Sequence, residues 1–437
     1  MGQKQWASRL GFLLAAAGSA IGLGNLWKFP YLMGRNGGFT FLIAYLIFVL
    51  ILGIPVMMLE MSLGRYTGRD PIQSYKIVHP KAKIVGILGV LAPFIILSYY
   101  SVIGGWILKY IVSYATTFNA PADFNAFIAE PQTVIWHLVF MVITIAICFK
   151  GVSGIEKASK FMMPALFILL IIIMIRSVTL EGSSVGLRFI FEPKAGFTLS
   201  SINAALGQVF YSLSLCMGIT ITYGSYLSKK ENIQKSCMIV AGMDTALAIG
   251  AGVFPAVFVF GLEPGQGPGL IFGTLPKVFE SMIGGPIFAI AFFILVFFAA
   301  LTSAIALLEV VAASAIDTLG WTRKKSVLVL GICIFILGIP SALSFGVLGD
   351  VTILNYSVFD FIGMITDNIL LPVGGILMCY FVAWKFDIMK LADEIEQGSK
   401  GFKIKKHWVN CIKYVTPILL IIVKLSGFVS IYTTIAR

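Results

Sequence analysis

The sequence predicts an all-α polytopic membrane protein, a single membrane domain over residues 1–437 with about eleven transmembrane helices. Of the 437 residues, 58% are hydrophobic and only 12% are charged, whereas a soluble domain carries roughly 25% charged residues. Apolar runs of about twenty residues recur along the whole chain, and each is long enough to cross a hydrocarbon core of roughly 30 Å as a helix. A soluble protein is therefore excluded.

Glycines, prolines and charge clusters separate the predicted spans. They lie near residues 9–34, 39–64, 85–117, 132–150, 160–178, 198–225, 233–260, 277–316, 325–345, 353–386 and 408–433. The two longest connections, 179–199 and 261–276, are rich in glycine. We expect them to face outward, either as caps over an entry path or as plain connectors.

The basic residues lie in alternate connections, and this pattern predicts the orientation. The net charge is +12, with basic clusters at 65–83, 150–160, 229–235 and 385–406, whereas 119–132 contains no Lys or Arg. By the positive-inside rule the N-terminus is cytoplasmic, and an odd number of spans leaves the C-terminus outside the cell membrane. The basic charge thus indicates membrane lipid as the partner rather than nucleic acid.

Two of the predicted spans are interrupted by polar and helix-breaking residues. Residues 15–30 read AAAGSAIGLGNLWKFP and residues 205–226 read ALGQVFYSLSLCMGITITYGSY. Broken helices at corresponding positions predict two structural repeats of opposite topology, 9–178 and 198–386, with the helix at 408–433 outside them. Because non-helical backbone at membrane depth is tolerated only beside protein or a polar cavity, the breaks predict a binding site. The alternative is that the glycines only permit close helix packing.

The chemistry of two helix breaks suits a zwitterion and a cation. Carbonyl groups freed from the helix coordinate cations, and the N-terminus of a half-helix attracts a carboxylate. The six cysteines show no paired spacing and no accompanying His cluster, so no metal-binding motif is indicated. The glycines of GSAIGLGN lie inside an apolar helix, not after a strand, so we expect no enzyme activity.

Four motifs resemble the neurotransmitter:sodium symporter family. They are WASRLGFLLAAAGSAIGLGNLWKFPYLMGRNGG at 6–38, GIPVMMLEMSLGRYTG at 53–68, GQVFYSLSLCMG at 207–218 and FFAALTSAIALLE at 297–309. The resemblance covers essentially the whole chain, apart from the twelfth helix that the family usually has. It implies the LeuT-type fold of five plus five helices in inverted repeats, with helices 1 and 6 broken at the midplane. It also implies uptake of an amino acid or its derivative together with Na⁺.

The resemblance further implies two sodium sites built from oxygen ligands. The first would use the Ala20 carbonyl, the side chains of Asn25, Ser212 and Asp244, and the carboxylate of the substrate. The second would use the carbonyls of Gly18, Ile21 and Ala299 and the hydroxyls of Thr302 and Ser303. Hard oxygen donors suit an alkali ion.

Asp244 departs from the family pattern, because the matching position is commonly Asn and some members bind chloride nearby. A fixed carboxylate here replaces that anion in our interpretation, so we expect no chloride requirement. The alternative is a buried acid that stays neutral, since an uncompensated charge at this depth is costly.

The substrate site follows from the same resemblance. The carboxylate of the amino acid would meet the amides of Leu23 and Gly24 and the hydroxyl of Tyr100. The remaining expected lining residues are Ala20, Ile96, Ile103, Tyr211, Ser212, Ser214, Met217, Ser303 and Leu307. This lining predicts a neutral, hydrophobic or aromatic L-amino acid, because a charged side chain would lack a partner.

Gate residues are also implied. Lys28 and Asp360 would form the outer gate, and Trp6, Tyr226 and Asp317 the inner one, while the intramembrane Glu60 is expected to bond to the broken helices. Two other functions stay open. A channel also has breaks at the midplane, and a sensor would bind an amino acid with Na⁺ without accumulating it. The sequence leaves the oligomeric state undetermined.

Overall fold

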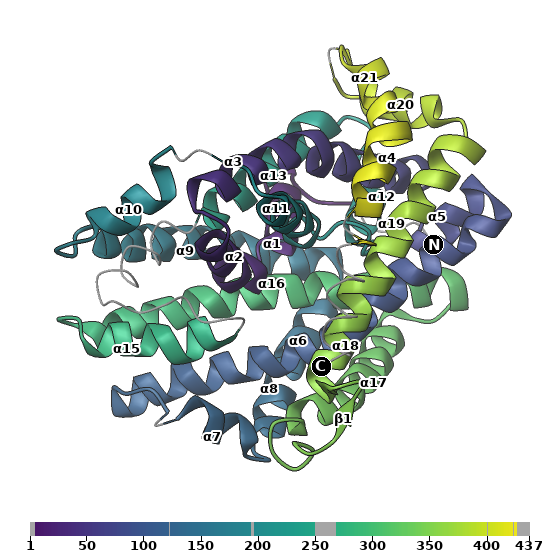
Figure 1. Ribbon diagram of the computed structural model, residues 1–437. Coiled ribbons are helices and arrows are strands. Elements are labelled where there is room, and N and C mark those ends of the chain that lie inside the picture. Colours follow the sequence, from purple (N-terminus) through teal and green to yellow (C-terminus); the bar gives the residue numbers. More distant parts are fainter. Residues whose placement is uncertain are drawn as a thin grey trace.

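A computed structural model describes residues 5–121, 123–193, 196–249, 268–399, 401–422 and 424–425. Over these residues six continuous helical segments are long and apolar enough to cross a membrane, and a bent pair of helices makes a seventh. The protein is thus a helical, multi-pass membrane protein, as predicted (Figure 1). The count of eleven spans stays a prediction.

The N-terminal half, up to residue 191, contains the following helices. They are α1 (Arg9–Ala20), η1 (Gly24–Lys28), α2 (Phe29–Arg35), α3 (Phe39–Phe48), η2 (Val49–Gly53), α4 (Ile54–Thr67), α5 (Pro71–Val78), η3 (Pro80–Ala82), α6 (Lys83–Thr117), α7 (Phe124–Ala129), α8 (Thr133–Cys148), α9 (Val152–Val178) and α10 (Ser184–Phe191).

The C-terminal half adds a short hairpin to its helices. The elements are α11 (Leu199–Ser212), α12 (Ile219–Ser225), α13 (Ile233–Ala248), η4 (Leu270–Thr274), α15 (Leu275–Glu280), α16 (Gly285–Leu319), α17 (Arg323–Leu343), β1 (Thr352–Ile353), β2 (Tyr356–Ser357), α18 (Val358–Ile365), η5 (Thr366–Leu370), α19 (Leu371–Tyr380), η6 (Phe381–Lys385), α20 (Ile388–Glu396), α21 (Lys405–Asn410) and η7 (Cys411–Val415).

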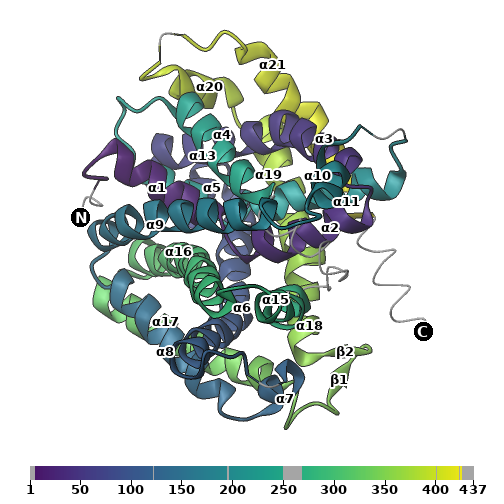
Figure 2. The ribbon, with the colours of Figure 1, turned by 90° about the vertical axis from the view of Figure 1, so that its left-hand side faces the viewer.

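Two long helices, α6 and α16, pack against each other at the centre of the molecule. Helices α8 and α17 cover the far side of α6, and α9 lies against α16 on its other side (Figure 2). Helix α16 is apolar over nearly its whole circumference, and 72% of its most apolar stretch is buried inside the protein. Such burial is expected for a helix enclosed by others. The short α1 packs against α9, α13 and α16, which places the first break deep inside the bundle.

Three predicted boundaries were wrong. The span predicted at 277–316 is two helices, α15 and α16, because Gly284 adopts a left-handed conformation (φ 74°) between them. The span predicted from residue 353 begins at Val358, after a hairpin in which Leu354 and Asn355 form the turn with positive φ. Helix α9 begins at Val152, not at 160, since its charged first turns include the Glu156–Lys160 pair.

Several connections that the sequence left without structure contain short helices. They include α5 within 64–85, α7 within 119–132, α10 within 179–199 and α20 within 386–408. Residues 250–260 of the predicted 233–260 span, residues 261–267 of the following connection, and residues 423 and 426–433 of the 408–433 span lie outside the described residues.

Candidate functional site

The first predicted break is confirmed. Helix α1 ends at Ala20, the chain turns through Ile21 and Gly22, and the following helical segment 24–35 is bent by 53° from α1. The side chain of Asn25 stabilises the turn, since its Oδ1 accepts a hydrogen bond from the amide of Gly22 at 3.0 Å. The break therefore uses a side chain within its own segment to satisfy a freed backbone group.

The second break lies between α11 and α12. Ser214, Cys216 and Gly218 have positive φ values of 50°, 63° and 67°, so the chain leaves the helical conformation altogether here. The buried carboxylate of Glu60 on α4 accepts from the amide of Cys216 at 3.1 Å and from the hydroxyl of Thr220. The expected hydrogen bond from Glu60 to the broken helices is thus present. It gives the amide of Cys216 the partner that a continuous helix would have supplied.

A buried polar cluster connects the two breaks to α13. The amide of Asn25 donates to Asp244 Oδ1 at 2.7 Å and to Ser212 Oγ at 2.9 Å, and the Ser212 hydroxyl donates to Asp244 Oδ2 at 2.7 Å. The hydroxyl of Tyr45 on α3 also lies 3.2 Å from Asp244 Oδ2. Three side chains expected at one sodium site are therefore together.

Sequence reasoning missed Tyr45. Its phenol lies in a run of apolar residues, and a tyrosine hydroxyl in such a run usually requires a buried hydrogen-bond partner. The need for such a partner could have identified Tyr45 from the sequence.

A second cluster of oxygen atoms lies where α16 passes the end of α1. The hydroxyl of Ser303 lies 3.1 Å from the carbonyl of Ile21 and 3.4 Å from that of Gly18. One residue earlier, the hydroxyl of Thr302 lies 3.1 Å from the carbonyl of Ala299. All five residues expected at the other sodium site are thus on facing segments, and their donor atoms are oxygens, the ligands that hard cations prefer.

No cluster of the kind that holds a transition metal occurs in the described part of the chain, where no three His, Cys, Asp or Glu residues gather.

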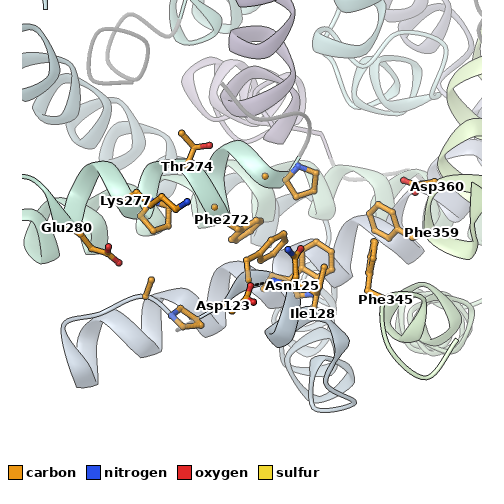
Figure 3. A pocket seen from close by; sticks show the side chains of 18 residues that line it. Asp123, Asn125, Ile128, Phe272, Thr274, Lys277, Glu280, Phe345, Phe359 and Asp360 are labelled. Carbon is orange, nitrogen blue, oxygen red and sulfur yellow. Dashed lines mark hydrogen bonds between the residues drawn. The ribbon is translucent and has the colours of Figure 1, made fainter. Parts of the chain in front are cut away.

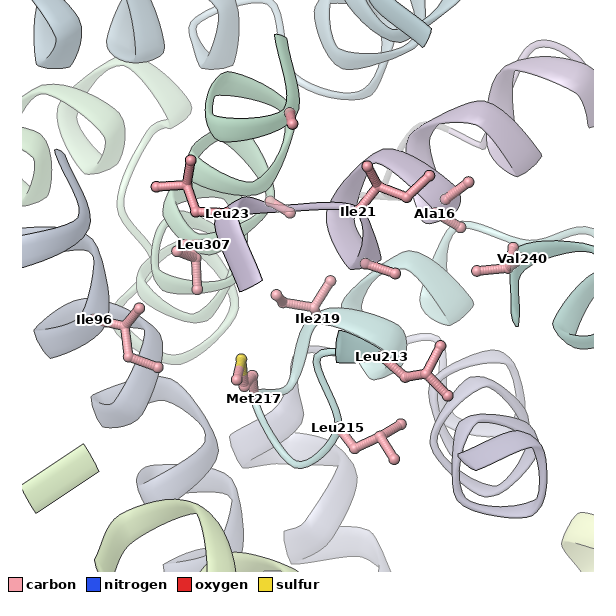
Figure 4. Close-up of a cluster of buried hydrophobic side chains, with 14 of the residues drawn as sticks. Ala16, Ile21, Leu23, Ile96, Leu213, Leu215, Met217, Ile219, Val240 and Leu307 are labelled. Carbon is pink, nitrogen blue, oxygen red and sulfur yellow. The ribbon is translucent and has the colours of Figure 1, made fainter. Parts of the chain in front are cut away.

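A small cavity separates the two breaks. Figure 4 shows the side chains of Ile96, Met217, Ile219 and Leu307 around it. The full lining is Ser19, Ala20, Gly22, Leu23, Gly24, Asn25, Ile96, Tyr100, Tyr211, Ser214, Met217, Ile219, Ser303 and Leu307. Among the residues expected there, Ile103 and Ser212 do not line this cavity, whereas Ile219 was missed because it begins α12 rather than the break.

Backbone approaches the cavity closely at two glycines. A Cβ atom added at Gly24 would lie 2.5 Å from the ring of Tyr211, and one at Gly22 would lie 2.9 Å from Ser303 Oγ. The amide of Leu23, between them, points to the Tyr100 hydroxyl at 3.4 Å. A side chain at either position would require Tyr211 or Ser303 to move, so the two glycines leave peptide groups bare at the cavity.

Lys28 does not contact Asp360, its expected partner at an outer gate. The ammonium of Lys28 lies 3.6 Å from the carboxylate of Asp367, not beside Asp360. Asp360 instead bonds to Ser357, which caps α18: its carboxylate accepts from the Ser357 hydroxyl at 2.7 Å. Asp360 lies near the start of α18, and Asp367 lies further along the same helical segment, in η5.

At the other end of the bundle lie the residues expected at the inner gate, Trp6, Tyr226 and Asp317. The amide of Trp6 donates to the Tyr226 carbonyl at 3.3 Å, and the Tyr226 hydroxyl donates to Glu309 at 2.7 Å. Asp317 accepts from the amide of Asp70 at 3.1 Å. Sequence analysis missed Glu309, whose carboxylate also forms a bidentate pair with Arg323. Its acid inside an apolar span was the available signal.

A second cavity, of about 870 Å³, lies away from the helix breaks (Figure 3). Helices α6, α7 and α15 contribute Trp106, Phe124 and Lys277, and Asp360 and Phe359 lie at its edge. It was not predicted from the sequence.

Two helices broken face to face, with oxygen clusters on either side of a small central cavity, define a secondary transporter that moves a small solute with an ion. The chain belongs to the sodium:neurotransmitter symporter family, whose model matches residues 3–126 and 122–435.

Several relatives match over nearly the whole chain. An uncharacterized sodium-dependent transporter, YhdH, of Bacillus subtilis is 41% identical, covering 97% of each chain. One from Haemophilus influenzae is 35% identical over 97% of this chain and 98% of that protein. The sodium- and chloride-dependent GABA transporter 2 of Bos taurus is 26% identical over 95% of this chain and 78% of its own.

A solved structure is also similar. The crystal structure of MhsT in complex with L-phenylalanine matches with a TM-score of 0.89 and 45% identity, covering 98% of this chain and 100% of that one. Together the fold and these relatives identify a sodium-coupled amino-acid transporter.

Proposed function

We propose that this protein imports a neutral L-amino acid with a hydrophobic or aromatic side chain by alternating access, together with two Na⁺ ions and without chloride. The observation that carries the proposal is the cavity between the two breaks, which joins bare peptide groups at Gly22 and Gly24 to an apolar wall.

The substrate class follows from what lines the cavity. Ile96, Met217, Ile219 and Leu307 present apolar side chains, and none of the described lining residues carries a charge. A charged substrate side chain would lose its hydration without gaining a partner, which is costly. The bound L-phenylalanine of MhsT, a protein of 45% identity, supports the same class.

The cavity must enlarge to admit an amino acid. Its volume is about 40 Å³, whereas ligand pockets typically measure about 300–1,000 Å³. The ring of Tyr211 and the flexible side chain of Met217 form part of the lining, and methionine adapts readily to a new neighbour. A closed conformation that opens to load its substrate is what alternating access requires.

The oxygen clusters are proposed as the two sodium sites. Around Asp244, a Na⁺ ion would replace the hydrogen bonds among Asn25, Ser212 and the carboxylate, with the carbonyl of Ala20 and the substrate carboxylate completing the shell. Near Ser303, the ion would sit among the carbonyls and hydroxyls that already face one another. An ion that shares the substrate carboxylate raises the affinity for the substrate, and the substrate raises the affinity for the ion equally.

Chloride independence rests on Asp244. It is fully buried, and both of its oxygens lie within 3.2 Å of donors from Asn25, Ser212 and Tyr45. A carboxylate surrounded by donors supplies the negative charge that would otherwise come from a bound anion, so it balances the nearby cation.

We also propose that the N-terminus is cytoplasmic and the C-terminus outside the cell membrane, from the distribution of basic residues. A tag at either end, tested for protease accessibility in right-side-out vesicles, checks this orientation.

Uptake by the purified full-length chain in proteoliposomes tests the transport proposal. A Na⁺ gradient should drive accumulation of one or more of the hydrophobic or aromatic amino acids, and replacing chloride by gluconate should leave the rate unchanged. Counterflow of labelled amino acid separates a carrier from a channel, because a channel cannot exchange solute one for one. Sodium-dependent binding without accumulation would instead identify a sensor.

A further inference from the structure

A basic cavity of about 860 Å³ lies at the end of the bundle where α1 begins. Arg9 at the start of α1 lines it, together with Lys230 and Lys235 beside the start of α13 and Lys403 in the segment before α21. These four residues line neither the central cavity nor the second cavity near α7 and α15. The basic cavity is thus separate from the proposed transport site.

The basic cavity carries more positive charge than its acids balance. Among its described lining residues the only acid is Glu231, whose carboxylate pairs with Arg9 at 3.0 Å. Lys230, Lys235 and Lys403 are exposed and form no ion pair within the described part of the chain. Three cations that share a concave surface attract anions and raise their local concentration.

The acids of α20, the helix just before the cavity segment 398–404, are paired with other bases. Glu394 contacts Arg65 and Lys229, each at 2.7 Å. Glu396 lies 3.2 Å from Lys405. The lysines of the basic cavity therefore gain no acid from α20, and their charge is left for an anion from outside the chain.

The two walls of the basic cavity are fixed to each other. Gly398 has a φ of 77°, and a Cβ atom there would lie 2.7 Å from the carbonyl oxygens of both Lys230 and Glu231. The buried guanidinium of Arg65 donates to the carbonyls of Glu231 and Gln397, which lie one beside each wall. A cavity held in this way loses little backbone entropy when a ligand binds.

A phosphate group suits this arrangement better than a single carboxylate. It offers several anionic oxygens that can each meet an ammonium, and lysine binds phosphate as a point charge. The N-terminus of the 16-residue helix α13 lies in the wall and adds positive potential. Because Asn232 already caps this helix by accepting from the amide of Lys235 at 2.9 Å, the lysine side chains supply most of the recognition.

The depth of the cavity in the membrane points to lipid as the source of the phosphate. Arg9 begins α1, whose 12 residues lead to the first break, a rise of about 18 Å. The breaks lie at the midplane in this fold, and half of the hydrocarbon core measures roughly 15 Å, so Arg9 lies among the headgroups. At the edge of the cavity Ile404 is 49% exposed and offers an apolar contact to the glycerol end of a lipid.

We propose that the basic cavity binds the phosphate group of an anionic phospholipid, with Lys230, Lys235 and Lys403 as its cationic contacts. Its volume of about 860 Å³ falls within the range of roughly 300–1,000 Å³ that is typical of small-molecule sites. This inference goes beyond the proposed function, since it concerns residues away from the central cavity and requires no transported solute.

Lipid binding to the purified full-length chain in neutral detergent tests the proposal. Native mass spectrometry over a series of phosphatidylglycerol concentrations gives the dissociation constant, and phosphatidylcholine with the same acyl chains measures binding without net charge. Combining Lys230→Gln, Lys235→Gln and Lys403→Gln should weaken binding of phosphatidylglycerol by at least about tenfold, since each lysine close to an anionic lipid contributes about fivefold in affinity.

Two further variants complete the experiment. Combining Lys81→Gln, Lys157→Gln and Lys324→Gln removes the same charge from exposed lysines outside the cavity and should leave binding as in the parent. Gln234→Lys adds a cation to the lining and should strengthen binding about two- to five-fold. A gain in affinity cannot result from misfolding, so this variant tests the site even if the triple variant is unstable.

The proposal is overturned if the cavity triple variant binds phosphatidylglycerol like the parent, if the control triple variant loses as much, or if Gln234→Lys gives no gain. Equal binding of phosphatidylcholine would also overturn it. Displacement of phosphatidylglycerol by inorganic phosphate at an equal concentration would assign the cavity to a soluble phosphate and overturn the lipid source. Because the measurement needs no amino acid, a failure of uptake in proteoliposomes would refute the transport function and leave this result standing.

Discussion

The hydroxyl of Ser212, at the last residue before the second break, donates to Oδ2 of Asp244 on α13 at 2.7 Å. The other oxygen of the same carboxylate accepts from Asn25, just after the first break. One buried acid thus holds both interrupted helices. Binding of an ion at Asp244 would therefore change the hydrogen bonds of both interrupted helices. Such a shared contact can couple binding of the ion to binding of the solute.

Asp244→Asn should weaken sodium binding by at least about tenfold, equivalent to about 1.4 kcal/mol, because a neutral amide replaces the only charged side chain proposed to bind this ion. Added chloride should then partly restore uptake by supplying the missing negative charge. The sodium dependence of uptake, with and without chloride, measures both effects. Asp123→Asn, at an exposed helix cap, is the control, and an unchanged sodium midpoint in the Asp244 variant would refute this role.

Gly24→Ala should abolish substrate binding and leave the protein folded. The added Cβ would lie 2.5 Å from the ring of Tyr211, so the ring must move into the cavity. Gly207→Ala is the matched control, since nothing lies within 4 Å of a Cβ at that position. Sodium-dependent thermal stabilisation by the substrate reads out binding, and equal stabilisation of both variants would contradict the predicted close approach.

Glu60→Ala should lower the free energy of unfolding by about 1–3 kcal/mol, because the amide of Cys216 would be buried without a partner. The uptake rate should fall as well, even under conditions where the variant stays folded, because the non-helical segment would no longer be held in place. Thermal unfolding in detergent and uptake in proteoliposomes measure the two effects. Glu60→Gln keeps an acceptor oxygen and should lie between the parent and Glu60→Ala; wild-type uptake in the alanine variant would count against the role.

A buried ionic cluster fixes α20 to α4. The guanidinium of Arg65 bonds to Glu394 at 2.7 Å, and Lys229 contacts the same carboxylate at 2.7 Å. Glu394→Gln should destabilise the protein by about 3–5 kcal/mol, since Arg65 would remain buried without its counter-charge. The adjacent Asp393 is 62% exposed, so Asp393→Asn should change stability by less than about 0.5 kcal/mol. Thermal unfolding of the two single variants decides between them; similar losses would show that burial of Glu394 is unimportant.

Asp70, in the connection between α4 and α5, predicts a pH effect. Burial, with a smaller contribution from the nearby carboxylate of Asp317, raises its pKa to about 6. Because the folded protein retains this proton above the usual carboxyl pKa of about 4, stability should fall as pH rises from about 4 to about 6 and then level off.

Asp70→Asn should remove that slope and, above pH 6, stabilise the protein by up to about 3 kcal/mol. Asparagine can also accept from the amide of Ile72, as Asp70 does at 2.8 Å, so the cap is kept. Thermal unfolding of both proteins between pH 4.5 and 8 measures the difference. Parallel curves for the two proteins would show that Asp70 does not retain its proton.

Local features predicted much of the site. The glycine-rich turn near Asn25, the polar break after Ser212 and the acid at Asp244 are all visible in short motifs, because a polar residue within an apolar span is costly unless a partner or a ligand meets it there. Helix ends were less predictable where charged turns extend a helix past the apolar run, as at Val152, or where one glycine divides two helices, as at Gly284.

The sequence by itself determined the membrane class, the two broken helices and most of the oxygen-bearing residues, since hydropathy and helix breakers act within one segment. Only the tertiary structure decided which side chains meet across segments: Tyr45 with Asp244, Glu309 with Tyr226 and Arg323, and Asp367 rather than Asp360 with Lys28. Such pairings depend on the rotation and relative depth of packed helices, and a π-helical turn such as η5 shifts both. No local pattern encodes that geometry.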